Sequence, residues 1–261
     1  MKQECKSMTL FDAWLTANGR SAGTSANYCR NVTALFIWLG NRDLTTETAN
    51  AWKAELLETH APVTVNAMLA ALNSYARFAG LDIRTQFVKI QRRLFRDSRR
   101  ELTRAEFENL LDAAQHCGKE RLSLLMETIC ASGIRVSEVK FITVEAAKAG
   151  RATISLKGKV REILLPGQLC RKLLKYAGKQ KIASGEIFLT GSGKSLSRGQ
   201  IWAEMKRLCK QAGVAESKVF PHNLRHLFAT AFYKINHDIV HLADILGHIE
   251  ACVLKLKEGN K

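Results

Sequence analysis

The sequence predicts a mainly α-helical protein built as two parts, a small helical bundle and a larger α-rich region with one small antiparallel sheet. Apolar residues recur at helical spacing along most of the chain, whereas the segments 152–156 and 160–165 alternate as strands do. The chain has 261 residues, of which 46% are hydrophobic. This length and composition fit two modest cores better than one large core, and they exclude wholesale disorder.

The first part of the chain is predicted to form a four-helix bundle over residues 1–91. One face of each helix is apolar: Phe11, Trp14 and Leu15 in the first; Tyr28, Val32, Leu35, Phe36 and Leu39 in the second; Trp52, Leu56 and Leu57 in the third, at 45–58; Met68, Leu72, Tyr75 and Phe78 in the fourth. Pro62 stands where the fourth helix begins and Gly80 where it ends. The aromatic side chains are expected to form the core of this bundle.

A second domain is expected over 103–261, because Thr103 and Glu106 match the capping box that begins many helices. The arginine-rich run before it, 92–102, interrupts the apolar periodicity and is assigned as a basic linker. Besides the helix after Thr103, helical patterns occur at about 121–132, 167–177, 198–212, 222–235 and 238–246. Strands are expected at 152–156, 160–165 and 186–189, with Lys157, Gly158 and Lys159 as the turn between the first two.

Positive charge is concentrated after the first 91 residues. The formal net charge is +16. Residues 1–91 carry nine basic and seven acidic side chains, 92–104 carry six and two, and 105–261 carry 25 and 15. Such a surplus suits a polyanionic partner, and an ordinary solvated surface is the alternative. A membrane surface is disfavoured, because no predicted helix pairs a basic face with a Trp, Phe and Leu face. Nucleic acid is therefore the leading partner.

Three short segments place cations and imidazoles where a packed core would not favour them. Residues 131–138 (ASGIRVSE) read as a helix end, a glycine break and a new helix start. Residues 221–226 (PHNLRH) open a helix, and residues 245–248 (ILGH) end another. Each segment alone has an ordinary explanation, since a single His or Arg on a helix is usually structural or solvated.

Taken in order, the segments resemble the motifs of the tyrosine recombinases, or phage integrases, which include the bacterial recombinases that resolve chromosome dimers. The G-I-R-x-x-E at 133–138 looks like their first arginine box, and the H-x-x-R-H at 222–226 looks like their H-x-x-R box. The L-G-H at 246–248 is similar to a third motif. The hairpin 156–159 occupies the place of their lysine-bearing β-turn. The resemblance covers most of 103–248, and the N-terminal helices suit the family's core-binding, SAM-like domain.

The resemblance implies that Arg135 and Arg225 bind the scissile phosphate. Cutting DNA by transesterification passes through a pentacoordinate phosphorane whose non-bridging oxygens carry extra negative charge. A planar guanidinium can bind two oxygens at once, which an ammonium does less well, and preorganised positive charge lowers the barrier. The resemblance also implies that His222 acts as a general base or proton shuttle for the nucleophile, and that His248 donates a hydrogen bond to the phosphate.

The other implied roles belong to the hairpin, the acidic residue of the first box and the linker. Lys157 would protonate the departing 5′ oxygen, although Lys159 lies on the same hairpin face and is an open alternative. Glu138, three residues beyond Arg135, would orient residues of the pocket. The side chains expected to bind DNA phosphates are Arg92, Arg93, Arg96, Arg99, Arg100 and Lys159.

No metal ion and no cofactor are implied. Arginine, lysine and histidine side chains can catalyse phosphoryl transfer without Mg²⁺, and the sequence has no carboxylate cluster to hold one. The stretch 191–195 (GSGKS) is too short for a nucleotide-binding loop. Seven cysteines occur singly, which suits neither zinc nor disulfides. With no apolar run of about 18 residues and no secretory signal, we expect a reduced, cytoplasmic protein that does not contact a membrane.

The resemblance ends after His248. The family's nucleophile is a tyrosine about nine residues beyond this histidine. In this chain Lys257 stands there, and residues 249–261 contain no Tyr, Ser or Thr. Upstream, Tyr233 is expected to be structural, and the Cys252 thiolate is a poor match for phosphorus. We therefore expect no covalent phosphotyrosyl intermediate, and a catalytic domain shortened at its C-terminus, as a shortened or frame-altered coding end would produce.

Two functions follow as expectations. The first is a site-specific DNA recombination or integration protein that binds double-stranded DNA, grips the scissile phosphate and is defective in cleavage. It would act as a homo-oligomer on paired half-sites or as a hetero-oligomer with an active recombinase. The alternative is a non-catalytic, sequence-specific DNA-binding or regulatory protein derived from an integrase. A type IB topoisomerase is disfavoured by the helical N-terminal domain.

Overall fold

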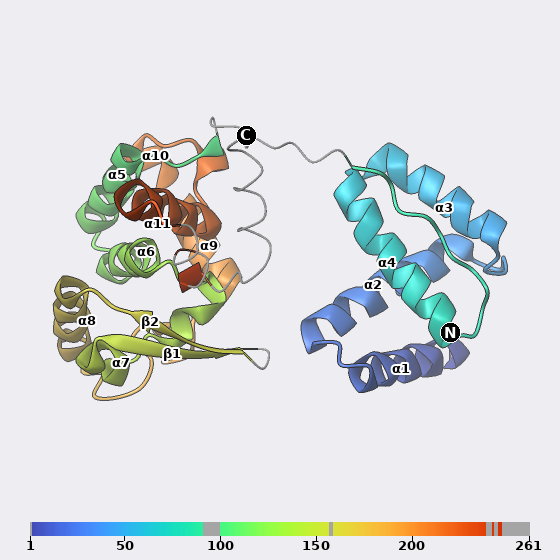
Figure 1. The fold of residues 1–261 in the computed structure, drawn as a ribbon, viewed down its shortest axis with the longest axis horizontal. Helices are drawn as coiled ribbons and strands as arrows, with labels where there is room; N and C mark the ends of the chain where they lie inside the picture. The colour runs from blue at the N-terminus through green and yellow to red at the C-terminus, as the bar shows by residue number, and fades with distance from the viewer. Residues whose placement is uncertain (1, 91–99, 157–158, 239–241, 243–244, 247–261) are drawn as a thin grey trace. The chain divides into compact units, whose positions relative to one another are not determined.

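The computed structural model of the protein describes residues 2–90, 100–156, 159–238, 242 and 245–246. It confirms the predicted fold class, because the described residues are mainly helical and form one two-stranded antiparallel sheet (Figure 1). The chain divides into two units, Met1–Leu94 and Phe95–Lys261. Among the described residues, no helix is both long enough and apolar enough to cross a membrane.

The first unit contains the four predicted helices, and side chains at their starts explain where they begin. They are α1 (Lys2–Ala17), α2 (Ala22–Leu39), α3 (Thr46–Thr59) and α4 (Pro62–Phe78). The Ser21 hydroxyl accepts a hydrogen bond from the Thr24 amide at the start of α2, and Thr45 and Thr48 form a capping box for α3. Pro62 is the first residue of α4, as the sequence predicts.

Aromatic side chains form much of the core of this unit, which agrees with the prediction. Phe11 is fully buried, and its ring meets that of Tyr75 edge-on at a centroid distance of 5.3 Å. Phe36 meets Tyr75 in the same way at 5.2 Å. Trp52 is buried in a neighbouring cluster. Edge-to-face pairs of this kind add stability beyond the burial of their area, so these rings hold α1, α2 and α4 together.

Two asparagines of α4 hold the extended segment 81–90 against the helix. The side-chain amide of Asn73 donates to the Thr85 carbonyl at 2.9 Å and accepts from the Thr85 amide at 2.8 Å. Asn66, two helical turns earlier, makes the same pair of bonds to Val88 at 2.9 and 2.8 Å. The two side chains therefore replace the backbone partners that this segment would otherwise find in a sheet.

Replacing Asn73 with Ala should lower the free energy of unfolding by about 1–3 kcal/mol, because it leaves two backbone groups of buried Thr85 without partners. The measurement is urea denaturation followed by circular dichroism. Asn50→Ala is the matched control, since Asn50 is exposed on α3 and its loss should cost little. Equal unfolding midpoints for the two variants would contradict the prediction.

The second unit is built around α6, which packs against four other α-helices. Its helices are α5 (Arg104–His116), α6 (Glu120–Ser132), η2 (Val136–Phe141), α7 (Val144–Ala149), α8 (Gly167–Lys179), α9 (Arg198–Lys206), α10 (Cys209–Ala212), η3 (Glu216–Lys218) and α11 (Pro221–Asn236). Leu125, Met126 and Ile129 of α6 are buried in one continuous core with α5 and α8. The predicted capping box of Thr103 and Glu106 is present at the start of α5.

The sheet is a hairpin of β1 (Arg151–Leu156) and β2 (Lys159–Leu164), paired from Arg151 opposite Leu164 to Leu156 opposite Lys159. Lys159 is therefore the first residue of a strand and not part of the turn, a correction to the expectation. Side chains alternate along β2: Ile163 is buried and Leu164 is exposed. Arg161 shares the inward face of Ile163, because residues two apart in a strand point the same way.

Two other predicted elements were wrong. The expected strand at 186–189 forms only isolated bridges, from Glu186 to Thr143 and from Leu189 to Ser195, because the side chains between them enter the helical core. The expected helix at 198–212 is divided into α9 and α10, since the Leu208 amide bonds to the Met205 carbonyl three residues back and interrupts the α-helical pattern. Most of the expected helix at 238–246 lies outside the described residues.

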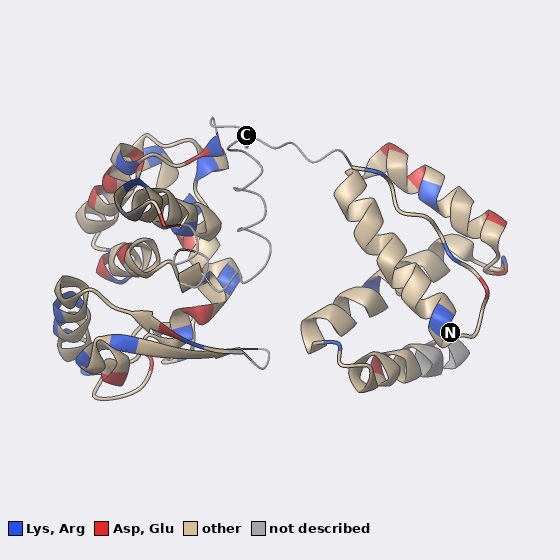
Figure 2. Cartoon of the chain, in the orientation of Figure 1, with Lys and Arg blue, Asp and Glu red and all other residues tan. Residues whose placement is uncertain are grey.

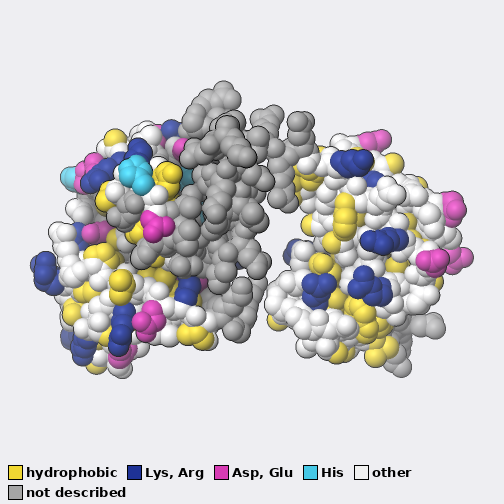
Figure 3. Space-filling model, in the orientation of Figure 1, with side chains coloured by type: hydrophobic (Ala, Val, Ile, Leu, Met, Phe, Trp, Pro, Cys, Tyr) yellow, Lys and Arg dark blue, Asp and Glu magenta, His cyan; other side chains and the backbone are white. Residues whose placement is uncertain are grey.

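Basic side chains are found along α8 and beside it (Figures 2 and 3). Lys172 pairs with Glu127 at 2.6 Å, and Lys179 pairs with Glu120 at 2.5 Å. Acidic side chains of α6 therefore offset part of the positive charge of α8. The charge of this helix is not by itself evidence of a surface for a polyanion.

Candidate active site

The first arginine box forms a sharp turn between α6 and η2, and Gly133 makes that turn possible. Gly133 has a φ of 65°, the left-handed conformation that glycine adopts most easily, and its amide bonds back to the Ile129 carbonyl at 2.9 Å. A Cβ atom at this position would lie 2.5 Å from the Phe228 ring of α11 and 3.2 Å from the Leu246 side chain. The absence of a side chain therefore lets both segments approach the turn.

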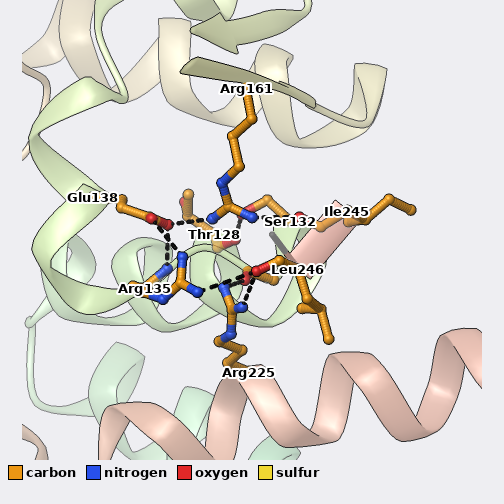
Figure 4. A network of polar contacts seen from close by, with 9 residues as sticks. Thr128, Ser132, Arg135, Glu138, Arg161, Arg225, Ile245 and Leu246 are labelled. Carbon is orange, nitrogen blue, oxygen red and sulfur yellow. Dashed lines mark hydrogen bonds and ion pairs between the residues drawn. The ribbon is translucent and has the colours of Figure 1, made fainter. Parts of the chain in front are cut away.

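Glu138 lies at the centre of an ion-pair network and is 2% exposed (Figure 4). Its carboxylate accepts from the Arg135 backbone amide at 2.7 Å and from Arg135 Nη1 at 3.0 Å. Arg161 Nη2 donates to the same carboxylate at 2.6 Å, and Arg161 Nη1 donates to the Ile245 carbonyl at 2.5 Å. The carboxylate thus joins the arginine turn to β2, as a residue that orients the pocket would.

The surroundings of Glu138 keep its carboxyl ionised. Burial raises the pKa, but the hydrogen bond from the Arg135 amide and the charges of Arg161 and Arg135 outweigh it, so that the pKa is lower than its ordinary value. With Arg225 included, the cluster contains three guanidiniums and one carboxylate and has a net charge of +2. The Arg135 side chain is 38% exposed, so this positive charge can reach an anionic ligand in solution.

Arg135 and Arg225 meet at one oxygen atom, the carbonyl oxygen of Leu246 (Figure 4). Arg225, on α11, is 4% exposed and donates through Nη2 to this oxygen at 2.5 Å and through Nη1 to the Gly133 carbonyl. Arg135 Nη2 donates to the same oxygen at 3.3 Å. Two guanidiniums from segments 90 residues apart in the chain therefore already share one hydrogen-bond acceptor.

The structure places the other predicted residues as follows. His222 is exposed in the first turn of α11, three residues before Arg225 and thus on a neighbouring helix position. Arg100 is exposed, and its carbonyl accepts from the side-chain amide of Asn223 at 2.7 Å. Lys159 begins β2, but its side chain is outside the described part. The predicted residues that lie outside the described residues are Arg92, Arg93, Arg96, Arg99, Lys157 and His248.

The sequence reasoning missed Arg161 and Asn223. Arg161 could have been found from the alternation of β2, since it lies two residues before the apolar Ile163 on the inward face. Asn223 had no such signal: it is 2% exposed and joins α11 to the end of the linker through the Arg100 carbonyl. Among the described residues, no three His, Cys, Asp or Glu side chains are grouped as the ligands of a metal ion would be.

The helical unit thus brings guanidiniums from separate segments to one shared acceptor, an arrangement of donors that suits phosphate oxygens. The chain matches the Phage integrase family over residues 100–252, more than half of its length. The protein belongs to this family, the tyrosine recombinases, which confirms the resemblance seen in the sequence.

Individual relatives and solved structures agree with this assignment. The chain is 29% identical over 247 residues to tyrosine recombinase XerA of Thermococcus kodakarensis, covering 91% of this chain and 85% of that protein. It is 28% identical to tyrosine recombinase XerC of Roseiflexus castenholzii, and the match covers 82% of this chain and 73% of that protein. Its fold is similar to that of a lambda integrase tetramer bound to a Holliday junction, with a TM-score of 0.74 and 20% identity over 95% of this chain and 77% of that chain. It is also similar to the Tn1549 transposon integrase in complex with transposon right end DNA, with a TM-score of 0.74 and 17% identity over 96% of this chain and 93% of that chain.

Proposed function

We propose that this chain is a site-specific DNA recombination or integration protein that binds double-stranded DNA and holds the scissile phosphate between Arg135 and Arg225. The observation that supports this most directly is the shared hydrogen-bond acceptor of the two guanidiniums, the Leu246 carbonyl oxygen. A non-bridging phosphate oxygen is the same kind of acceptor with more negative charge, so it would bind these groups more strongly. Solved structures of the same fold include complexes with DNA.

In this proposal the remaining residues act around the phosphate. Glu138 holds Arg135, His222 moves the proton of an attacking hydroxyl, and His248 donates to a phosphate oxygen. Lys157, or Lys159 in its place, protonates the 5′ oxygen as its bond to phosphorus breaks. The DNA backbone on either side is bound by the linker arginines and the hairpin: Arg92, Arg93, Arg96, Arg99, Arg100 and Lys159.

We further propose that these 261 residues hold the phosphate without cutting the strand. The family's reaction needs a tyrosine oxygen to attack phosphorus, and residues 249–261 contain no tyrosine. The chain would then act on paired half-sites as a homo-oligomer, or with an active recombinase that supplies the nucleophile. Related structures show a dimer and a tetramer on DNA, which agrees with such an arrangement. We place this activity in the cytoplasm.

Duplex binding and strand cleavage test the two parts of the proposal separately. A labelled duplex should bind at low salt, and its affinity should fall steeply as salt rises. Arg225→Lys should weaken binding about tenfold, because an ammonium keeps the charge but cannot donate to two separated oxygens. Lys175→Met, on the exposed face of α8, is the control and should have a small effect. Absence of binding at low salt would contradict the proposal.

A nicked suicide duplex resolved on a denaturing gel should give no covalent protein–DNA band. A band that disappears in Tyr233→Phe or Cys252→Ser would contradict the proposed cleavage defect. A tail carrying a tyrosine, joined after His248, should restore the band if the pocket is catalytic. If that extended protein bound DNA without cutting it, the result would favour the alternative, a non-catalytic DNA-binding or regulatory protein. The absence of a tyrosine from residues 249–261 is consistent with this alternative as well.

A further inference from the structure

Arg161 is a partly buried arginine that belongs to none of the recombinase motifs. Its side chain is 17% exposed and extends from β2, where Arg161 pairs with Ile154 of β1. It makes two hydrogen bonds of 2.5–2.6 Å, one to the Glu138 carboxylate and one to the Ile245 carbonyl. Those partners lie 23 and 84 residues away in the chain. A single side chain thus connects the hairpin, the arginine turn and the segment next to Leu246 (Figure 4).

The charge balance shows what Arg161 does for Arg135. One oxygen of the Glu138 carboxylate, Oε2, accepts from Arg161 and from the Arg135 backbone amide, and the other, Oε1, accepts from Arg135 Nη1. Arg135 therefore keeps its second nitrogen, Nη2, for the Leu246 carbonyl. If Arg161 were absent, Arg135 would be the nearest cation left to neutralise a buried carboxylate, and bidentate pairing would draw Nη2 away from that position. The net charge of the cluster would also fall from +2 to +1.

The second contact of Arg161 positions the backbone. Its bond to the Ile245 carbonyl lies one residue from the carbonyl that Arg135 and Arg225 share. The same side chain extends from β2, which begins two residues after Lys157, the proposed acid, in the sequence. Displacement of this guanidinium would therefore loosen two of the segments that the proposed function brings to the phosphate.

Building on the proposed function, we propose that Arg161 is a positioning residue of the phosphate site. It donates a hydrogen bond to one oxygen of the Glu138 carboxylate, so that Arg135 can keep a guanidinium N–H directed at the DNA phosphate. It also fixes the hairpin of β1 and β2 to the backbone carbonyl of Ile245. It acts through Arg135 and does not itself bind the phosphate.

The test measures duplex affinity and its salt dependence by fluorescence anisotropy. Arg161→Met should weaken binding about tenfold and reduce the slope of log affinity against log salt by about 0.9, the loss of one phosphate contact. Arg161→Lys should fall between this variant and the wild type, because one ammonium cannot serve both partners well. Arg151→Met is the matched control: it removes a cation from the same hairpin, but Arg151 is 61% exposed and its nearest carboxylate is 4.0 Å away. It should stay within about twofold of the wild type.

Adding Glu138→Gln to Arg161→Met separates a positioning role from a direct contact or from simple packing. Once the buried charge is removed, Arg135 is released toward the phosphate, and both affinity and salt slope should recover most of the loss. No recovery, or an Arg161→Met affinity equal to that of Arg151→Met, would overturn this inference alone. A wild-type protein that does not bind the duplex would overturn the proposed function and this inference with it. If Arg161→Met does not fold, Arg161→Lys with and without Glu138→Gln makes the same comparison.

Discussion

Replacing Glu138 with Ala is expected to lower the free energy of unfolding by about 3–5 kcal/mol. The carboxylate is 2% exposed and is the shared partner of Arg135 and Arg161, so its removal leaves two guanidiniums close together with no anion between them. Urea denaturation at pH 7 measures the loss. Glu108→Ala is the control, because Glu108 is 57% exposed in its pair with Arg104 and exposed pairs contribute little. Similar losses in the two variants would contradict a central role for Glu138.

The same carboxylate should make stability depend on acid pH. The native pKa of Glu138 is lower than its ordinary value of 4.5, so the stabilisation is complete above that ordinary value. It is lost as the pH falls through the lower native pKa, because the unfolded chain then takes up the proton more readily. Between about pH 5 and pH 3 the wild type should therefore lose more stability than Glu138→Ala. If the free energies of unfolding of the two proteins fell in parallel as the pH decreased, the contacts of Glu138 with Arg135 and Arg161 would not lower its pKa.

Gly133→Ala is the second large effect, with an expected loss of about 2–5 kcal/mol. A left-handed backbone costs a residue with a Cβ atom roughly 1–2 kcal/mol, and overpacking adds about 1–3 kcal/mol. The added methyl would lie 2.5 Å from the ring of Phe228 on α11, so this ring has to shift to make room. Because α11 also carries Arg225, duplex affinity should fall as well. Thermal unfolding and anisotropy measure the two effects.

Gly150→Ala separates the two costs in Gly133→Ala. Gly150 has a φ of 69°, close to the 65° of Gly133, but no atom lies within 4 Å of where its Cβ would be. Its substitution should therefore cost only the backbone term, about 1–2 kcal/mol, and leave DNA binding unchanged. If the two alanine variants were equally stable, the close approach of α11 to the arginine turn would not be a significant constraint.

The fold was predictable where local sequence and burial agree. The helices of the first unit have apolar stripes, a Pro at the first position of α4 and side-chain caps, all of which act within a few residues. The segment 186–189 was not predictable in this way. An apolar run of four residues fits a strand or a buried loop equally well, and only the surrounding helical core decided against a strand. The break between α9 and α10 depends on the hydrogen bond from the Leu208 amide to the Met205 carbonyl, and no residue type in this segment predicts it.

The sequence by itself determined the chemistry of the site: two arginines and a glutamate in recombinase motifs, and a glycine at the turn between two helices. The tertiary structure decided which of these groups meet. That Arg135 and Arg225 share the Leu246 carbonyl, and that Arg161 joins Glu138 to Ile245, depends on contacts across 21 to 111 residues of chain. Motif spacing describes neighbours along one helix or strand. The direction of a side chain toward a distant segment is set by the packing of the whole core, which is why the partners of Arg161 became visible only in the folded protein.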